Sequence, residues 1–172
     1  MTLFDQVLAL LTAHRVPCAL IGAAALAAHG VARSTYDIDL LTTDARVLDR
    51  GLWTALHDQG STVDIRRGDI DDPLGGVVRI ETPRDRPVDI ILGKYGWQTR
   101  AVERADRPPG GAPVVRPGDL VLLKLYAGGA QDLWDVRELL QLPGHERLIA
   151  EVEADLEGHS DAMRGLWVTV RR

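Results

Sequence analysis

The sequence contains almost no cysteine and no long apolar run. Its single cysteine, Cys18, excludes a disulfide within the chain and lies in an apolar stretch, which predicts a buried core residue. No segment approaches the roughly 18 consecutive apolar residues of a membrane helix. The first residues, Met1–Asp5, lack the basic start and apolar run of a secretory signal. We therefore expect a cytoplasmic location and no membrane partner.

Lysine is also scarce, because Lys94 and Lys124 are the only two in 172 residues. The formal net charge of −5 argues against a broad basic footprint for duplex nucleic acid. A hydrophobic content of 45% and a charged content of 26% are typical of a soluble globular protein. The length fits one ordinary domain with a small helical appendage.

Hydrophobic periodicity and turn residues divide the chain into short elements. Strands are expected at 18–21, 36–41, 62–66, 77–81, 88–92 and 114–115. Helices are expected at 2–14, 23–29, 43–60, 97–105, 118–127, 130–141 and 145–156, and the pattern of 161–170 leaves helix and loop open. The short linkers after residue 62 favour antiparallel neighbours. The sequence thus predicts an α/β (α+β) fold: a mixed sheet flanked by helices in a core of residues 1–116, with a helical segment, 117–172, packed on it as one compact unit.

Two acidic residues flank an apolar one in the segment Asp37–Ile38–Asp39–Leu40. Side chains alternate between faces along a strand, so Asp37 and Asp39 point one way while Ile38 and Leu40 face a core. Carboxylates about 7 Å apart along a strand repel each other unless a cation lies between them. Oxygen ligands of this kind suit Mg²⁺, with Mn²⁺ as the other candidate. The segment therefore predicts a metal site.

Upstream of these acids, Gly22 and Ala23 form a turn at the start of an alanine-rich helix. The backbone N–H groups of such a turn can approach a phosphate. Carboxylates for metal beside a phosphate-binding turn indicate phosphoryl transfer.

A third acid, Asp89, stands in the apolar run Val88–Leu92. A buried carboxylate without a partner is costly, and a metal site shared with Asp37 and Asp39 would supply one. The alternative places Asp89 on the solvent-facing side of an edge strand.

The segments Gly22–Ala23, Arg33–Leu40 and Val88–Ile90 resemble the DNA polymerase β-type nucleotidyltransferase superfamily. The longer segments Leu20–Gly30 and Pro117–Gly128, the second followed by Asp132 and Asp135, are similar to its small bacterial AbiEii-like branch. That branch includes toxins of toxin–antitoxin and phage-defence systems. The resemblance covers roughly residues 16–42 and 86–140.

The resemblance implies that Asp37 and Asp39 bind metal ions bridging the triphosphate of an NTP. Asp89 would complete the metal site and help to activate the attacking hydroxyl. Gly22 and Ala23 would hold the β- and γ-phosphates through backbone amides. The family usually has Gly–Ser or Gly–Gly at this turn, so the missing hydroxyl of Ala23 predicts weaker phosphate affinity.

The remaining candidate nucleotide-binding residues each have a structural alternative. Lys124 lies among apolar neighbours and needs an anion, which a triphosphate would supply, unless its ammonium reaches solvent. Arg33 could contact phosphate or pair with Asp37. Thr35 could orient the two acids by hydrogen bonds. Asp132 could contact nucleotide or acceptor, and both it and Asp135 could instead cap and charge their helix.

Another acidic segment, Asp69–Ile70–Asp71, lies between Gly68 and Pro73, where turn chemistry explains aspartates without a metal.

We therefore expect a metal-dependent nucleotidyltransferase that moves an NMP from an NTP to a hydroxyl and releases pyrophosphate. The acceptor could be an RNA end such as that of tRNA, a protein or a small molecule, and a cognate antitoxin is a further expected partner. A second hypothesis is a catalytically weak or inactive module of the same fold that binds nucleotide or a partner protein. A third is a phosphohydrolase that uses the same acids.

Overall fold

A computed structural model describes residues 1–172, which divide into two compact units. Unit 1 comprises Met1–Ala24 and Ser34–Val115, and unit 2 comprises Ala25–Arg33 and Arg116–Arg172. The helix α2 (Gly22–Ala28) carries the chain from one unit to the other. None of the helices combines the length and the apolar composition that crossing a bilayer requires. The expected packing of residues 117–172 on the core stays a prediction.

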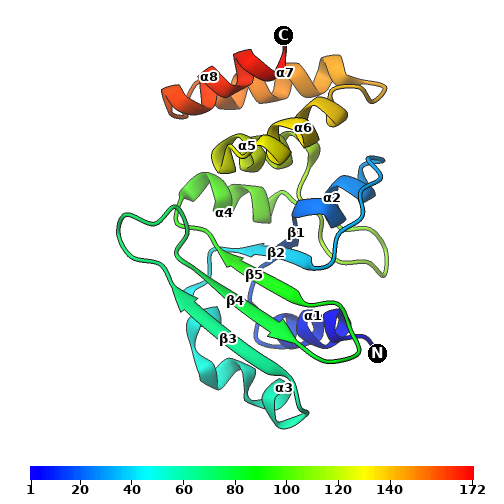
Figure 1. Ribbon diagram of the computed structural model, residues 1–172, viewed down its shortest axis with the longest axis vertical. Helices are drawn as coiled ribbons and strands as arrows, with labels where there is room; N and C mark the ends of the chain where they lie inside the picture. Colours follow the sequence, from blue (N-terminus) through cyan, green and yellow to red (C-terminus); the bar gives the residue numbers. More distant parts are fainter. The chain divides into compact units, whose positions relative to one another are not determined.

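Unit 1 is built on a five-stranded mixed sheet in the order β1-β2-β5-β4-β3 (Figure 1). Its strands are β1 (Ala19–Leu20), β2 (Ile38–Thr42), β3 (Thr62–Arg67), β4 (Gly76–Glu81) and β5 (Val88–Leu92). The neighbouring strands β2 and β5 are parallel, and all other neighbouring pairs are antiparallel. The predicted mixed sheet and the antiparallel arrangement of the last three strands are therefore confirmed.

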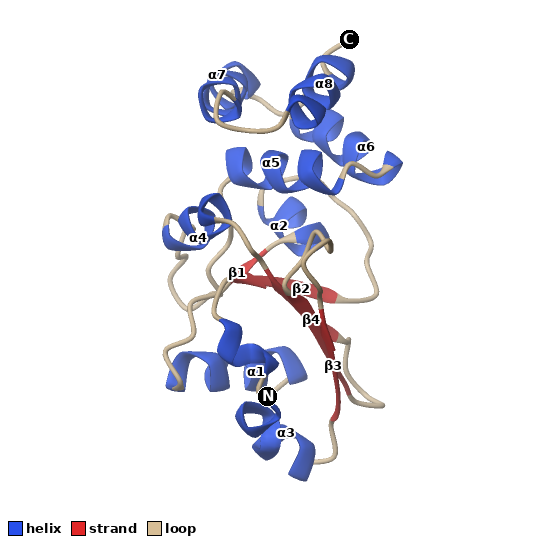
Figure 2. Ribbon diagram, turned by 90° about the vertical axis from the view of Figure 1, so that its left-hand side faces the viewer, coloured by secondary structure: helices blue, strands red, loops and turns tan.

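One face of this sheet is covered by α1 (Leu3–Ala13) and α3 (Thr54–Asp58), as Figure 2 shows. The apolar side chains of α1, including Leu3, Val7 and Leu11, form a buried cluster with Leu40 of β2 and Ile90 of β5. The polar side chains that alternate with these strand residues therefore point to the opposite face of the sheet. This packing decides which side of the sheet can carry chemistry.

Two predicted elements of unit 1 are wrong. The single helix expected over 43–60 is two short 3₁₀ segments, η1 (Ala45–Leu48) and η2 (Arg50–Trp53), followed by α3. The side chain of Asp49 accepts from the backbone N–H of Gly51 and starts a new turn there, which interrupts a continuous helix. The strand expected at 114–115 forms only isolated bridges through Val114. The helix expected at 97–105 is α4 (Gly96–Glu103).

Unit 2 consists of helices. Besides the second part of α2, they are α5 (Pro117–Ala127), α6 (Ala130–Leu139), α7 (His145–Leu156) and α8 (Asp161–Val170). Helix α5 contacts each of the other three and buries most of its length, and Gly128 ends it in a left-handed conformation with φ of 68°. The segment 161–170, left open by its sequence pattern, is a helix capped by Ser160.

Candidate metal centre

Asp39 and Asp89 lie side by side because β2 and β5 are parallel and in register. Asp39 pairs with Asp89, and the next residues along each strand, Leu40 and Ile90, pair inside the buried core. Residues directly opposite each other in neighbouring strands share a face of the sheet. Burial of Leu40 and Ile90 therefore turns both carboxylates to the other face.

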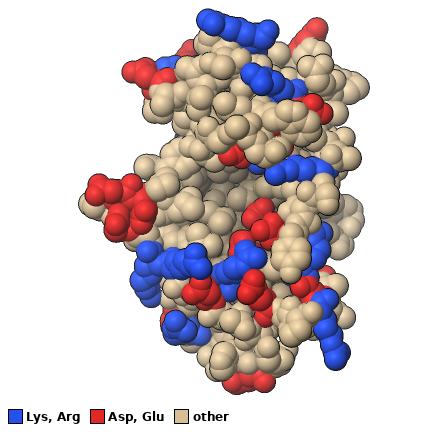
Figure 3. Space-filling model, viewed as in Figure 1, with Lys and Arg blue, Asp and Glu red and all other residues tan.

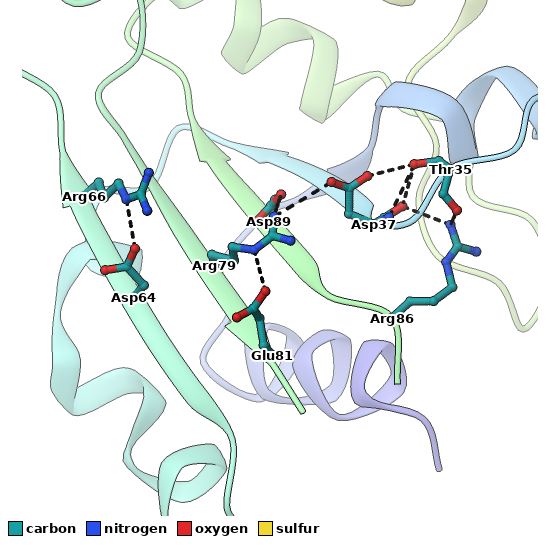
Figure 4. A network of polar contacts seen from close by, with 8 residues as sticks. All are labelled: Thr35, Asp37, Asp64, Arg66, Arg79, Glu81, Arg86 and Asp89. Carbon is teal, nitrogen blue, oxygen red and sulfur yellow. Dashed lines mark hydrogen bonds and ion pairs between the residues drawn. The ribbon is translucent and has the colours of Figure 1, made fainter. Parts of the chain in front are cut away.

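Asp37 precedes β2 and is held by its own loop. The hydroxyl of Thr35 donates a hydrogen bond of 2.8 Å to Asp37 Oδ1, which is the orienting contact that the sequence predicts. Arg86 donates to the backbone carbonyl oxygens of Thr35 and Asp37 at 3.1 and 3.0 Å (Figure 4). Arg86 therefore fixes the loop that presents Asp37, a role for which the sequence shows no signal.

The three carboxylates converge. Each of Asp37, Asp39 and Asp89 offers an oxygen, and these oxygens lie within 4.8 Å of one another. The alternative that Asp89 faces solvent on an edge strand is wrong, because β5 lies in the middle of the sheet and Asp89 is buried.

The pKa of Asp89 reflects its burial and its charged neighbours. Burial raises the pKa of its carboxyl above the usual value of 3.8, while the nearby guanidinium of Arg79 lowers that pKa. The charges of Asp37 and Glu81 add to the upward shift. Its oxygen Oδ1 is buried and has no hydrogen-bond partner. A buried anionic oxygen left without a partner is costly, so this atom is suited to a cation.

Gly22 brings the chain backbone against this group of acids. Its φ of 60° lies in the left-handed region, and a Cβ added there would lie 2.1 Å from Oδ2 of Asp39. The backbone N–H of Ile21 donates to the carbonyl of Asp39 at 3.0 Å, which ties the turn to β2. Only glycine combines this conformation with so close an approach. Ala23 follows as the second residue of α2.

The donor set fits a divalent cation of the Mg²⁺ or Mn²⁺ type. Three carboxylates supply oxygen ligands, which are those that hard cations prefer. The unpartnered Oδ1 of Asp89 is independent structural support, since it lacks the hydrogen bond that a buried carboxylate oxygen normally has.

Two charged residues beside the acids were not singled out by the sequence. Arg79 of β4 lies opposite Asp89 in the ladder and contacts it, and Glu81 contacts the same guanidinium at 2.8 Å (Figure 4). Arg79 and Glu81 are two residues apart in a predicted strand, so the sequence could have placed both side chains on one face of that strand. Nothing local in the sequence reveals the register that brings that strand beside Asp89.

Unit 2 contains its own charge network, in which Lys124 and Asp135 are buried. Lys124 Nζ lies 2.9 Å from Asp132 Oδ1 and 2.7 Å from Asp135 Oδ2, and Arg33 Nη1 lies 2.5 Å from the same oxygen of Asp135. Gln131 donates to Asp135 Oδ1 at 3.1 Å. The anions that Lys124 needs are thus supplied within unit 2, and the alternative that its ammonium reaches solvent is wrong because the residue is buried.

The interpretation of Asp135 as a capping residue is also wrong. Its side chain is fully buried in α6 between two cations, whereas Asp132 accepts from the backbone N–H of Gly129 and does cap the helix. Sequence reasoning underrated Asp135 because Arg33 is 102 residues away in the chain.

The acidic segment 69–71 forms a turn, as predicted. Asp69 Oδ1 accepts from the backbone N–H groups of Asp71 and Asp72. The ammonium of Lys94 donates to the backbone carbonyl oxygens of Asp69, Ile70 and Asp72 and holds the turn closed.

Over the sheet of unit 1, positive and negative side chains are interspersed and form no broad basic field on the face seen in Figure 3.

No protein-family model and no curated protein matches the chain. Among solved structures, the chain is similar to ANT(2'')-Ia in complex with adenylyl-2''-tobramycin, with 17% identity, a TM-score of 0.57, and coverage of 92% of this chain and 97% of that one. A solution structure of the antibiotic-resistance factor ANT(2'')-Ia is similar at 16% identity with a TM-score of 0.55, covering 90% of this chain and 89% of that one. The chain therefore has the nucleotidyltransferase fold of these structures.

Proposed function

We propose that this protein is a metal-dependent nucleotidyltransferase that transfers an NMP from an NTP to a hydroxyl acceptor. The observation that carries the proposal is the convergence of Asp37, Asp39 and Asp89, with the unpartnered Oδ1 of Asp89, beside the Gly22 turn. Mg²⁺, or Mn²⁺ in its place, would neutralise the charge that develops on the transferred phosphoryl group.

In this reaction the acceptor oxygen forms a bond to the α-phosphorus, and the bond from that phosphorus to the β-phosphate oxygen breaks. Pyrophosphate leaves with the bonding electron pair. Asp89 would help to activate the acceptor hydroxyl by accepting its proton as a general base. The backbone N–H groups of Gly22 and Ala23 bind the β- and γ-phosphates.

For unit 2 we propose that Arg33, Lys124 and Asp132 take part in nucleotide binding. The buried Lys124 and Asp135 form one network with the partly exposed Arg33 and Asp132, which supports a specific role, since buried charges are costly to desolvate. The matching test is the NTP affinity of Lys124→Met, measured by calorimetry. A decrease is expected, and an unchanged affinity in a folded variant contradicts this assignment.

The acceptor and the biological setting are finer parts of the same proposal. The resemblance of residues 16–42 and 86–140 to the AbiEii-like branch supports a toxin in the cytoplasm, with an RNA end or a protein as acceptor and a cognate antitoxin as partner. The likeness to ANT(2'')-Ia, crystallised with an adenylylated tobramycin, supports a small-molecule acceptor. Parallel assays with total RNA, purified proteins and aminoglycosides decide between these classes.

Label transfer tests the reaction. The protein is incubated with each α-labelled NTP, Mg²⁺ and the candidate acceptors, and both labelled product and pyrophosphate are followed. We expect transfer that is lost in Asp39→Asn and retained in Asp64→Asn. Asp64 is a matched control because it lies on the same sheet, in β3, and is held by Arg66 away from the three acids.

A catalytically inactive binding module is the second candidate. It is favoured by Ala23, which lacks a hydroxyl, and by Lys124, whose charge is already balanced by carboxylates. NTP binding without transfer to any acceptor supports this module and contradicts the enzyme. Release of phosphate without label transfer supports the phosphohydrolase instead.

A further inference from the structure

A row of charged residues crosses the sheet of unit 1 at one level. Asp39 pairs with Asp89, Asp89 pairs with Arg79, and Arg79 pairs with Asp64 in the strand ladders. Opposed residues share a face, so the side chains form a row of charges in the order negative, negative, positive, negative. Arg79 is the cation of this row.

Arg79 touches the group of acids that would bind metal. Its Nη1 lies 2.7 Å from Asp89 Oδ2 and 3.8 Å from Asp37 Oδ2, so one guanidinium faces two of the three carboxylates (Figure 4). Its Nε donates to Glu81 Oε1 at 2.8 Å. Glu81 lies two residues further along β4, which places both side chains on the same face.

We propose that Arg79 is a built-in counter-cation that competes with the divalent ion for Asp37 and Asp89, and that Glu81 holds Arg79 when the ion binds. The inference rests on the metal site of the proposed function. It adds that metal affinity at this site is set by an arginine and a glutamate that are not themselves ligands.

Charge repulsion explains why the side chain of Arg79 must move when a divalent ion binds. Arginine stays protonated in a protein, so the positive charge of Arg79 remains beside the carboxylates unless its side chain moves. A divalent ion bound by Asp37 and Asp89 would lie within a few ångströms of that charge and be repelled by it. The side chain of Arg79 is 32% exposed and therefore has room to turn towards Glu81. Glu81 is the only one of its three acidic contacts outside the candidate metal-binding group.

Mn²⁺ binding measured by electron paramagnetic resonance tests the proposal without any turnover. Removal of the competing charge in Arg79→Gln should raise Mn²⁺ affinity by about fivefold, as expected for one nearby charge in a partly solvated site. Glu81→Gln should lower affinity by about threefold, because Arg79 then has only the metal-binding carboxylates as partners. The effect of Glu81→Gln should be much smaller in the Arg79→Gln background.

Arg66→Gln is the matched control. Arg66 is an arginine of the neighbouring strand β3 that pairs with an acid two residues away, Asp64, just as Arg79 pairs with Glu81. Its loss removes the same charge from the same sheet without touching the three acids, so Mn²⁺ affinity should change by less than about twofold.

An unchanged or weaker Mn²⁺ affinity in Arg79→Gln overturns the proposal, and a weaker one would show that Arg79 positions Asp89 for the metal. Should Arg79→Gln fail to fold, as judged by circular dichroism, Glu81→Gln alone decides: its affinity must fall. Absence of Mn²⁺ binding in wild type overturns both this inference and the metal site of the proposed function. Affinities that change as expected in a protein without label transfer support the inference and refute the transferase.

Discussion

Replacement of Gly22 by alanine tests whether the turn must approach Asp39 so closely. The added Cβ would lie 2.1 Å from Asp39 Oδ2, far inside van der Waals contact, and the residue would keep a φ of 60°. Either the backbone of the turn or the carboxylate of Asp39 must move. We therefore expect Gly22→Ala both to destabilise unit 1 and to weaken Mn²⁺ binding at the candidate metal site.

The variant Gly60→Ala distinguishes the two causes of this destabilisation, which are the left-handed backbone and the steric clash. Its φ is 92°, and an added Cβ would meet nothing within 4 Å, so Gly60→Ala measures the cost of left-handed backbone alone. That cost is about 1–2 kcal/mol, reduced by about 0.4–1 kcal/mol through the smaller entropy of the unfolded chain. Gly22→Ala adds the collision, for which overpacking costs of about 1–3 kcal/mol are typical. The difference between the two variants corresponds to about 2–4 °C in melting temperature for each kcal/mol.

Thermal and urea unfolding, with Mn²⁺ titration of the same samples, check the prediction. In an Asp39→Ala background the obstructing carboxylate is absent and only the Cβ of residue 39 remains, at 3.2 Å, so Gly22→Ala should cost clearly less there than in wild type and approach the cost of Gly60→Ala. The reasoning is refuted if Gly22→Ala melts together with Gly60→Ala and binds Mn²⁺ as wild type does.

Three further predictions concern other parts of the chain. Asp135→Ala should cost about 3–5 kcal/mol in urea unfolding, because it removes the fully buried carboxylate that Arg33 and Lys124 share and leaves the buried Lys124 with Asp132 alone; a loss below about 1 kcal/mol would indicate a surface-like network. Hydrogen bonds from Arg46 lower the pKa of Asp44 below 3.8, so Asp44 stabilises the fold above pH 3.8 and this stability is lost as pH falls through the folded pKa. Asp44→Asn should therefore melt below wild type at pH 7 and approach it near pH 2 to 3, and an equal gap at both values contradicts this. Burial raises the pKa of Cys18 to about 11, so iodoacetamide at pH 8 should modify the folded protein far more slowly than the urea-unfolded chain, and equal rates would show that the thiol is accessible.

Local sequence patterns were sufficient to predict several helices and strands. The helix predicted over 2–14 is α1, and the hydroxyl of Thr2 and the carboxylate of Asp5 form a capping box at its start, which is a local pattern because both partners lie within one helical turn. The strand predicted over 88–92 is β5 with the same bounds, since an apolar run bounded by turn residues identifies a buried strand. The helix predicted over 43–60 failed because the competing turn at Asp49 is a local detail that periodicity does not register.

The residues of the candidate metal site also divide into those that the sequence predicts and those that it does not. Asp37, Asp39 and Asp89 were identified from alternation and from an acid in an apolar run, and the structure brings their oxygens together. Arg79 and Glu81 were not, because their position beside Asp89 depends on the register of β4 against β5. That register is set by which apolar side chains of each strand enter the core, a property of the folded packing.

The sequence by itself determined which acids could meet, because side-chain alternation and burial of apolar neighbours are consequences of local residue order. Tertiary structure alone decided which cations those acids meet. Arg79 reaches Asp89 across a strand ladder, and Arg33 reaches Asp135 from 102 residues away. The first pair depends on the register of β4 against β5, and the second on the packing of segments far apart in the chain, so neither follows from local residue order alone.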